Sequence, residues 1–255
     1  MSDLNKLINI IKKLRSPDGC EWDKEQTSES LVPYLLEETY EVIEAIEKND
    51  YIALKEELGD LLLHVVFQAE LLSENQEYTI NESINNVVDK LIKRHPHIFN
   101  NDKTKDWEKG QWELAKQKEK NRDSVLEGVP ISFPALLRAR RIQEKAAGVG
   151  FDWDDKKQVL SKIDEEIKEL KDAIISEKGI NEELGDVLFT IVNLSRHLNL
   201  DPEKSLRLSI EKFSRRFKKI EKDLKSKNIN MKDLSLEKLD EMWNKNKQLS
   251  NESKN

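Results

Sequence analysis

The chain has 255 residues, of which 36% are charged and 37% are hydrophobic, and its formal net charge is −7. This acidic balance argues against a general nucleic-acid-binding protein, which needs a basic surface. The single cysteine excludes an internal disulfide and, with no signal-like apolar N-terminus, favours a cytoplasmic protein. The most apolar stretch, residues 61–72, is too short to cross a bilayer, so no membrane partner is expected.

Apolar residues recur with the 3.6-residue period of amphipathic helices in every long segment, and none alternates with the period of a strand. The sequence therefore predicts an all-α protein. In chain order, the expected helices span residues 4–14, 30–48, 51–73, 80–94, 107–120, 136–146, 159–175, 181–198, 202–225 and 236–247. Residues 22–26 are expected to form a loop or a helix start. The polar tail, residues 249–255, is expected to be disordered.

Two short patterns, E-E-x-x-E and E-x-x-D, occur twice and in the same order. Glu37 and Glu165 begin the two E-E-x-x-E segments and lie 128 positions apart, and Asp60 and Asp186 end the two E-x-x-D segments. This spacing is that of a whole domain. The sequence predicts a tandem duplication of a helical-bundle domain, with domains at residues 1–120 and 136–255. The linker between them, residues 121–135, is rich in glycine and proline.

The repeated acidic segments predict a metal site in each copy. Residues three or four positions apart share a helix face, so two packed helices would aim several carboxylates at one point. Such a cluster is unfavourable unless a cation binds there, and all-oxygen ligands suit Mg²⁺. A solvated acidic face is the simpler interpretation of one such segment, but its recurrence beside apolar runs favours the metal. The candidate ligands are Glu37, Glu38, Glu41, Glu57 and Asp60, and in the second copy Glu165, Glu166, Glu169, Glu183 and Asp186.

Redox metal chemistry is not expected, because none of the four histidines follows an acidic residue by three positions, as di-iron bundles require. His64 lies four residues after Asp60, where it could support a ligand. The simpler interpretation is a helix histidine whose hydrogen bonds are satisfied, since Thr190 stands at the matching position of the second copy.

Basic residues lie in register downstream of the acidic segments. Lys90 and Arg94 in the first copy align with Lys212 and Arg216 in the second. Residues four positions apart share a helix face, where they can hold phosphate oxygens, although a solvated basic helix would look the same. Pro96 is expected to end the first basic helix, whereas the second continues, which favours the second copy as the more active one.

Tryptophans occupy matching positions in the two copies. Trp112 and Trp243 each head a late basic segment, and Trp22 and Trp153 lie in the matching early loops. Each ring can stack on a nucleobase or can simply pack within the protein.

Residues 35–41, 57–60, 93–99, 149–153 and 212–217 carry a resemblance that covers nearly the whole chain. Together these segments resemble the MazG nucleoside triphosphate pyrophosphohydrolases in their two-domain form. The resemblance implies a homodimer that hydrolyses nucleoside triphosphates to the monophosphate and pyrophosphate. It also implies dependence on Mg²⁺, with Mn²⁺ as a substitute, and a broad base tolerance suited to cleaning the nucleotide pool.

The resemblance also implies roles for individual residues. The implied metal ligands are Glu166, Glu169, Glu183 and Asp186, matched in the first domain by Glu38, Glu41, Glu57 and Asp60. Lys212, Arg216 and Trp243 would face the nucleotide. A carboxylate that is not a ligand, Glu165 or Glu182 (in the first copy Glu37 or Glu56), is expected to deprotonate the attacking water.

Two alternatives stay open. The chain could be a non-catalytic helical interaction module whose acidic clusters bind a metal for stability. It could also keep the enzyme fold with a narrower substrate, such as dCTP or phosphoribosyl-ATP. Release of pyrophosphate separates the first alternative from the enzyme, and a panel of nucleotides separates the second.

Overall fold

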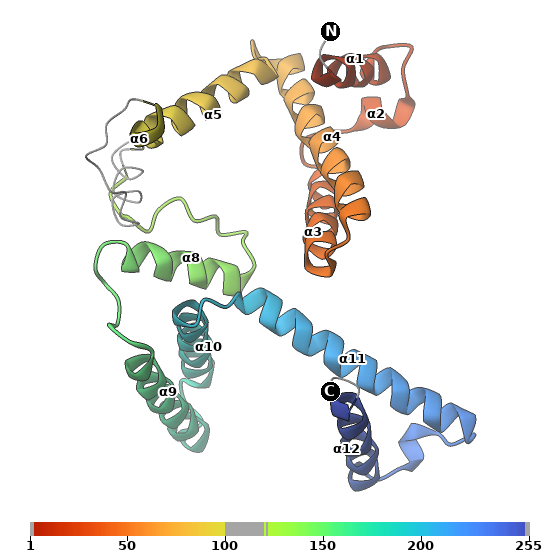
Figure 1. The fold of residues 1–255 in the computed structure, drawn as a ribbon, viewed down its shortest axis with the longest axis vertical. Coiled ribbons are helices and arrows are strands. Elements are labelled where there is room, and N and C mark those ends of the chain that lie inside the picture. The colour runs from red at the N-terminus through yellow and green to blue at the C-terminus, as the bar shows by residue number, and fades with distance from the viewer. Residues whose placement is uncertain (1–2, 100–119, 121, 253–255) are drawn as a thin grey trace. The chain divides into compact units, whose positions relative to one another are not determined.

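In a computed structural model, the described residues are 3–99, 120 and 122–252, and they form helices joined by turns without any strand (Figure 1). The prediction of an all-α protein is confirmed. The chain divides into two units, Met1–Lys105 and Asp106–Asn255. The helix expected at residues 107–120, with Trp112, falls outside the described residues except at Lys120. No described helix has both the length and the apolar character needed to span a bilayer.

The first unit is built around an antiparallel pair of helices. Its described helices are α1 (Asp3–Arg15), α2 (Glu21–Glu25), α3 (Val32–Lys48), α4 (Tyr51–Asn75), α5 (Ile80–Arg94) and α6 (Pro96–Phe99). Asn49 closes α3 in the left-handed region, at φ 55°, and Asp50 then caps α4 by accepting hydrogen bonds from the backbone of Ile52 and Ala53. This two-residue turn folds α4 back along α3 (Figure 1). The helix α5 ends at Arg94, as Pro96 predicted.

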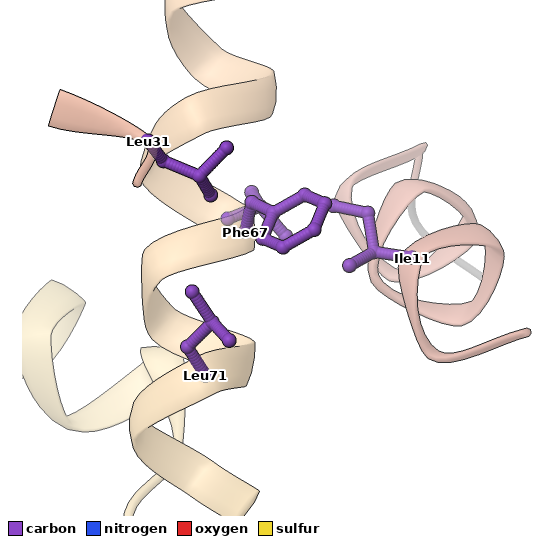
Figure 2. Packing of buried hydrophobic residues seen from close by; sticks show 5 residues of the cluster. Ile11, Leu31, Phe67 and Leu71 are labelled. Atoms are coloured by element: carbon purple, nitrogen blue, oxygen red, sulfur yellow. The ribbon is translucent and has the colours of Figure 1, made fainter. Parts of the chain in front are cut away.

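The core of this unit lies between α1 and α4. Ile11, Leu31 and Phe67 pack together with Val66 and Leu71 (Figure 2). Each fully buried side chain of this size contributes about 1.5–3 kcal/mol relative to exposure. The guanidinium of Arg15 lies 5.4 Å from the Phe67 ring centroid and forms two hydrogen bonds, of 2.6 and 2.7 Å, to the Glu74 carboxylate. These contacts anchor the C-terminal half of α4 to α1.

The second unit repeats the antiparallel pair and adds two long C-terminal helices. Its elements are α8 (Ala135–Ala147), α9 (Lys156–Ser176), α10 (Ile180–His197), α11 (Pro202–Ser226), a 3₁₀ helix (Met231–Asp233) and α12 (Leu236–Glu252). The tail was expected to be irregular from residue 249, but α12 continues to Glu252, so that prediction is wrong for its first four residues. An amphipathic helix that is already formed continues through polar residues as long as no proline or glycine stops it.

Several polar contacts between elements fix the second unit. The Gln143 side chain of α8 donates to the backbone carbonyl of Phe189 on α10 at 2.8 Å. The Lys145 ammonium donates at 3.0 Å to the carbonyl of Val125, within the segment predicted as the linker. Asp201 caps α11 through the Lys204 amide at 2.9 Å, with Pro202 in the first turn. The exact domain boundaries predicted from the sequence stay a prediction.

Candidate metal and nucleotide site

In the first unit, the α3–α4 hairpin gathers carboxylates from both helices. One oxygen each of Glu38 and Glu41 on α3 and of Glu57 on α4 lies within 4.8 Å of the others. Glu38 and Glu41 share a helix face because they are three residues apart. The tight turn at Asn49 and Asp50 fixes which residue of α4 they meet. The sequence therefore dictates the cluster through helix period and turn position together.

The second unit builds the same arrangement with a slightly different set. One oxygen each of Glu166 on α9 and of Glu183 and Asp186 on α10 lies within 4.8 Å of the others. Glu166 is buried, with 5% of its surface exposed. We call these two groups the first and the second carboxylate cluster.

The electrostatics of both clusters favour a cation. Burial raises the pKa of Glu38, and the charges of Glu41, Asp60 and Glu57 raise it further. The pKa of Glu57 is raised by burial and then by Glu41. The pKa of Glu183 is raised for the same two reasons, by burial and by its acidic neighbours. Each raised value means that the ionised form is disfavoured, and a bound divalent cation would remove that cost.

The predicted site residues are distributed around these clusters. Asp60 and Glu169 lie outside the two groups of three, yet they are close enough that their charges raise the pKa of Glu57 and of Glu183, respectively. The predicted water-activating carboxylates are exposed on the same helices: Glu37, Glu56, Glu165 and Glu182. The all-oxygen donor set fits Mg²⁺, and the ligand roles of all these residues stay predictions.

One basic residue at the second cluster was not predicted from the sequence. The ammonium of Lys162 lies 2.8 Å from an oxygen of Glu165 and 2.8 Å from an oxygen of Glu166. These two hydrogen bonds, Glu165 first, raise the pKa of Lys162 above its usual range. The signal was present in the sequence, since Lys162 precedes Glu166 by four positions on the same helix face.

The first cluster has aromatic neighbours instead. Tyr34 stands four residues before Glu38, as Lys162 does before Glu166. The Tyr34 ring stacks on His64 with centroids 6.4 Å apart and meets the edge of Trp22 at 6.0 Å. The Nδ1 atom of His64 is buried without a hydrogen-bond partner, so the expectation of a satisfied histidine is wrong. Burial lowers the His64 pKa, and the charge of Asp60 partly opposes this.

The basic helices carry the predicted phosphate-binding residues. On α11 the guanidinium of Arg216 lies 5.7 Å from the Trp243 ring centroid, and Phe213 contacts the same ring at 5.0 Å. The Arg216 Nε atom is buried without a hydrogen-bond partner. Lys212 and, on α5, Lys90 are exposed, and Arg94 is half-buried. Trp243 thus packs within its own unit, and its role in stacking on a base stays a prediction.

Comparison with known proteins identifies the family. The profile of the MazG nucleotide pyrophosphohydrolase domain matches the chain twice, at residues 26–99 and 155–220. The chain belongs to the MazG family. Each matched segment contains one carboxylate cluster, so the predicted tandem duplication is confirmed as a repeat of the MazG domain.

Relatives that match nearly the whole of this chain support the assignment. The chain is 49% identical over 244 residues to the nucleoside triphosphate pyrophosphohydrolase/pyrophosphatase MazG of Thermotoga maritima, covering 95% of this chain and 94% of that protein. It is 40% identical over 253 residues to the nucleoside triphosphate pyrophosphohydrolase of Escherichia coli K12, covering 95% and 96%. The uncharacterized protein YabN of Bacillus subtilis is 40% identical over 252 residues, which cover 52% of YabN. The resemblance stated from the motifs is confirmed.

Proposed function

We propose that the chain hydrolyses nucleoside triphosphates to the nucleoside monophosphate and pyrophosphate, with Mg²⁺ as the cofactor and Mn²⁺ as a substitute. The observation that carries the proposal is the convergence of three carboxylates from facing helices within 4.8 Å in each MazG domain. Relatives that match nearly the whole chain are named for this reaction.

The residues of each cluster would divide the chemistry between them. The metal-binding set is Glu38, Glu41, Glu57 and Asp60 in the first domain and Glu166, Glu169, Glu183 and Asp186 in the second. These residues would hold Mg²⁺, which would supply positive charge to neutralise the triphosphate oxygens and the charge that develops on them. A carboxylate outside the set, Glu165 or Glu182, accepts the proton of the attacking water. The water attacks the α-phosphorus, and the bond from this phosphorus to the oxygen that bridges it to the β-phosphorus breaks. The β- and γ-phosphates leave with that oxygen as pyrophosphate.

The basic helices would hold the substrate. Lys212 and Arg216 on α11, and Lys90 and Arg94 on α5, lie one helical turn apart in each pair. The buried Nε of Arg216 lacks a hydrogen-bond partner, and a phosphate oxygen would supply one. Stacking of the base on Trp243 would tolerate any nucleobase, because every base has an aromatic face. This broad base tolerance suits an enzyme that cleans the nucleotide pool.

We further propose a cytoplasmic homodimer that acts without nucleic acid or membrane partners. Long helices leave apolar side chains exposed in both units, and such patches mark protein interfaces. The exposed residues include Ile84, Val87, Val88 and Leu91 on α5 and Leu206, Ile210 and Phe213 on α11. Sedimentation equilibrium of the purified chain tests this, with twice the chain mass expected.

A nucleotide panel tests the reaction. The purified chain, with Mg²⁺, is incubated with each NTP and dNTP and with phosphoribosyl-ATP, and the products are separated by anion-exchange chromatography. Equal amounts of monophosphate and pyrophosphate are expected, and EDTA should abolish turnover. Diphosphate with orthophosphate would contradict the proposal. If no substrate is turned over, the interpretation as a non-catalytic interaction module is supported. If only one substrate is turned over, the chain is an enzyme with a narrow substrate range.

Matched variants locate the site. Glu169→Ala and Asp186→Ala should each remove activity at the second cluster while the helical signal in circular dichroism is kept. Asp164→Ala is the control, because Asp164 is an exposed acid on the same helix α9, two positions from Glu166 and five from Glu169, and therefore on another face. Loss of the helical signal in either test variant would show that the residue is structural.

A further inference from the structure

The two carboxylate clusters have different residues one helical turn before Glu38 and Glu166, and this difference changes the local charge. Lys162 lies one helical turn before Glu166, and its ammonium is 2.8 Å from oxygens of both Glu165 and Glu166. At the matching position of the first cluster stands Tyr34, whose neutral ring stacks on His64. The second cluster therefore carries a built-in positive charge that the first lacks at this position.

The surroundings of the first cluster make the contrast clearer. The charges that act on Glu38 come from Glu41, Asp60, Glu57 and Glu37, all of them acidic. Glu166, in contrast, is a buried carboxylate with an ammonium on one of its oxygens. A divalent cation that binds Glu166 must displace this ammonium or share the carboxylate with it. Two cations held on one carboxylate repel each other, and the repulsion is stronger where solvent is partly excluded.

We propose that Lys162 competes with divalent cations for Glu166, so that the second cluster binds them more weakly than the first when no nucleotide is present. This inference rests on the metal role in the proposed function and adds its regulation. A unit charge about 5 Å from a divalent ion in a water-like dielectric, screened by salt, weakens binding by about tenfold. A triphosphate would offer the ammonium an alternative anion, so metal and substrate binding become coupled at the second cluster.

Electron paramagnetic resonance of free Mn²⁺ measures the affinity of each cluster without turnover. The full chain is used with one cluster disabled at a time. Glu41→Gln with Glu57→Gln leaves the second cluster, and Glu183→Gln with Asp186→Asn leaves the first. On the chain that keeps the second cluster, Lys162→Met should tighten the Mn²⁺ dissociation constant about tenfold.

Lys157→Met is the matched control for this variant. Lys157 is an exposed lysine on α9, nine residues before Glu166 and about 13 Å along the helix. Lys157→Met changes the net charge by the same amount as Lys162→Met. It should change the Mn²⁺ dissociation constant by no more than about twofold, since salt screens a charge at that distance. If Lys162→Met loses helical signal in circular dichroism, Lys162→Gln replaces it, because an amide still bonds to the buried Glu166.

The reciprocal variant completes the test. Tyr34→Lys, on the chain that keeps the first cluster, should weaken Mn²⁺ binding about tenfold, because the new ammonium reaches Glu38 as Lys162 reaches Glu166. The inference is overturned if removing Lys162 leaves the affinity unchanged or weakens it, or if Tyr34→Lys has no effect. A parent chain that binds no Mn²⁺ at either cluster would instead overturn the metal role in the proposed function.

Discussion

Glu38→Gln should stabilise the metal-free protein and remove most of the stabilisation that Mg²⁺ gives to the first unit. Glu38 faces Glu41 and Glu57 with carboxylate oxygens within 4.8 Å, so each like-charged pair costs about 0.9 kcal/mol in water. Screening by salt and side-chain freedom reduce the total to about 1 kcal/mol. For a unit of this size, about 1 kcal/mol corresponds to a rise of about 4 °C in Tm.

Differential scanning calorimetry of the full chain measures this, in EDTA and in MgCl₂. In the parent protein, Mg²⁺ at about a hundred times its Kd should stabilise the first unit by about 2.7 kcal/mol. In Glu38→Gln most of that increment should be lost, because a ligand is gone. The control is Glu44→Gln, also on α3, whose carboxylate pairs with Lys48 and not with the cluster. It should lower Tm slightly and keep the full response to Mg²⁺.

The pH dependence of stability tests independently whether the ionised Glu38 carboxylate destabilises the metal-free protein. The pKa of Glu38 is raised, so the folded state holds its proton more tightly than the unfolded chain, and stability falls as pH rises above the ordinary glutamate value of about 4.5. The advantage of Glu38→Gln in EDTA should therefore vanish below about pH 4.5, grow as the pH rises from there to the raised pKa, and stay constant above it. A lower Tm in EDTA, or an unchanged response to Mg²⁺, would refute the reasoning.

Three further predictions address the core, an ion pair and the division of labour. Phe67→Ala should lower the free energy of unfolding by about 3–5 kcal/mol in urea titrations, because it leaves a cavity and removes the contact with Arg15. Hydrogen bonds from Arg15 lower the pKa of Glu74, so they contribute about 1 kcal/mol to stability above pH 4.5, and this contribution is lost as the pH falls through the lowered pKa. The difference in unfolding free energy between the parent protein and Glu74→Gln should therefore disappear below the lowered pKa. Glu183→Gln should remove most pyrophosphate release and Glu57→Gln little, and the reverse pattern would place turnover in the first domain.

The helices could be predicted from the sequence because their signals are local. The expected span at residues 80–94 agrees with α5, and the others described in full agree to within three residues at either end, apart from α12, which continues five residues further. Helix period and the short turns at Asn49 and Gly179 also determine which carboxylates meet. The all-α class and the two-fold repeat also follow from these local signals, because each copy repeats the same amphipathic helices with an apolar face to pack.

Contacts that depend on the path of the chain could not be predicted. Arg196 on α10 bonds through both terminal nitrogens to Asp152, which lies in the loop before α9, 44 residues away. His197 reaches the same carboxylate at 3.2 Å. No local pattern links these residues, because the pairing depends on how α9 and α10 pack. The burial of His64 Nδ1 without a hydrogen-bond partner is a similar case, since burial also depends on how the helices pack.

If both clusters bind a metal as proposed, comparing the two copies separates the residues that the metal requires from those that can vary. A cation needs several oxygen ligands at once, so a change at Glu57 or Glu183 would lose the site, and both copies keep the acids. The residue one turn before Glu38 or Glu166 lies outside the acidic set, so it is Tyr34 in one copy and Lys162 in the other while both copies keep the acids. A change at such a position is expected to alter the affinity by about tenfold without abolishing binding. If Lys162 competes with the cation as proposed, the two domains would fill at different Mg²⁺ concentrations, the first without nucleotide and the second together with it.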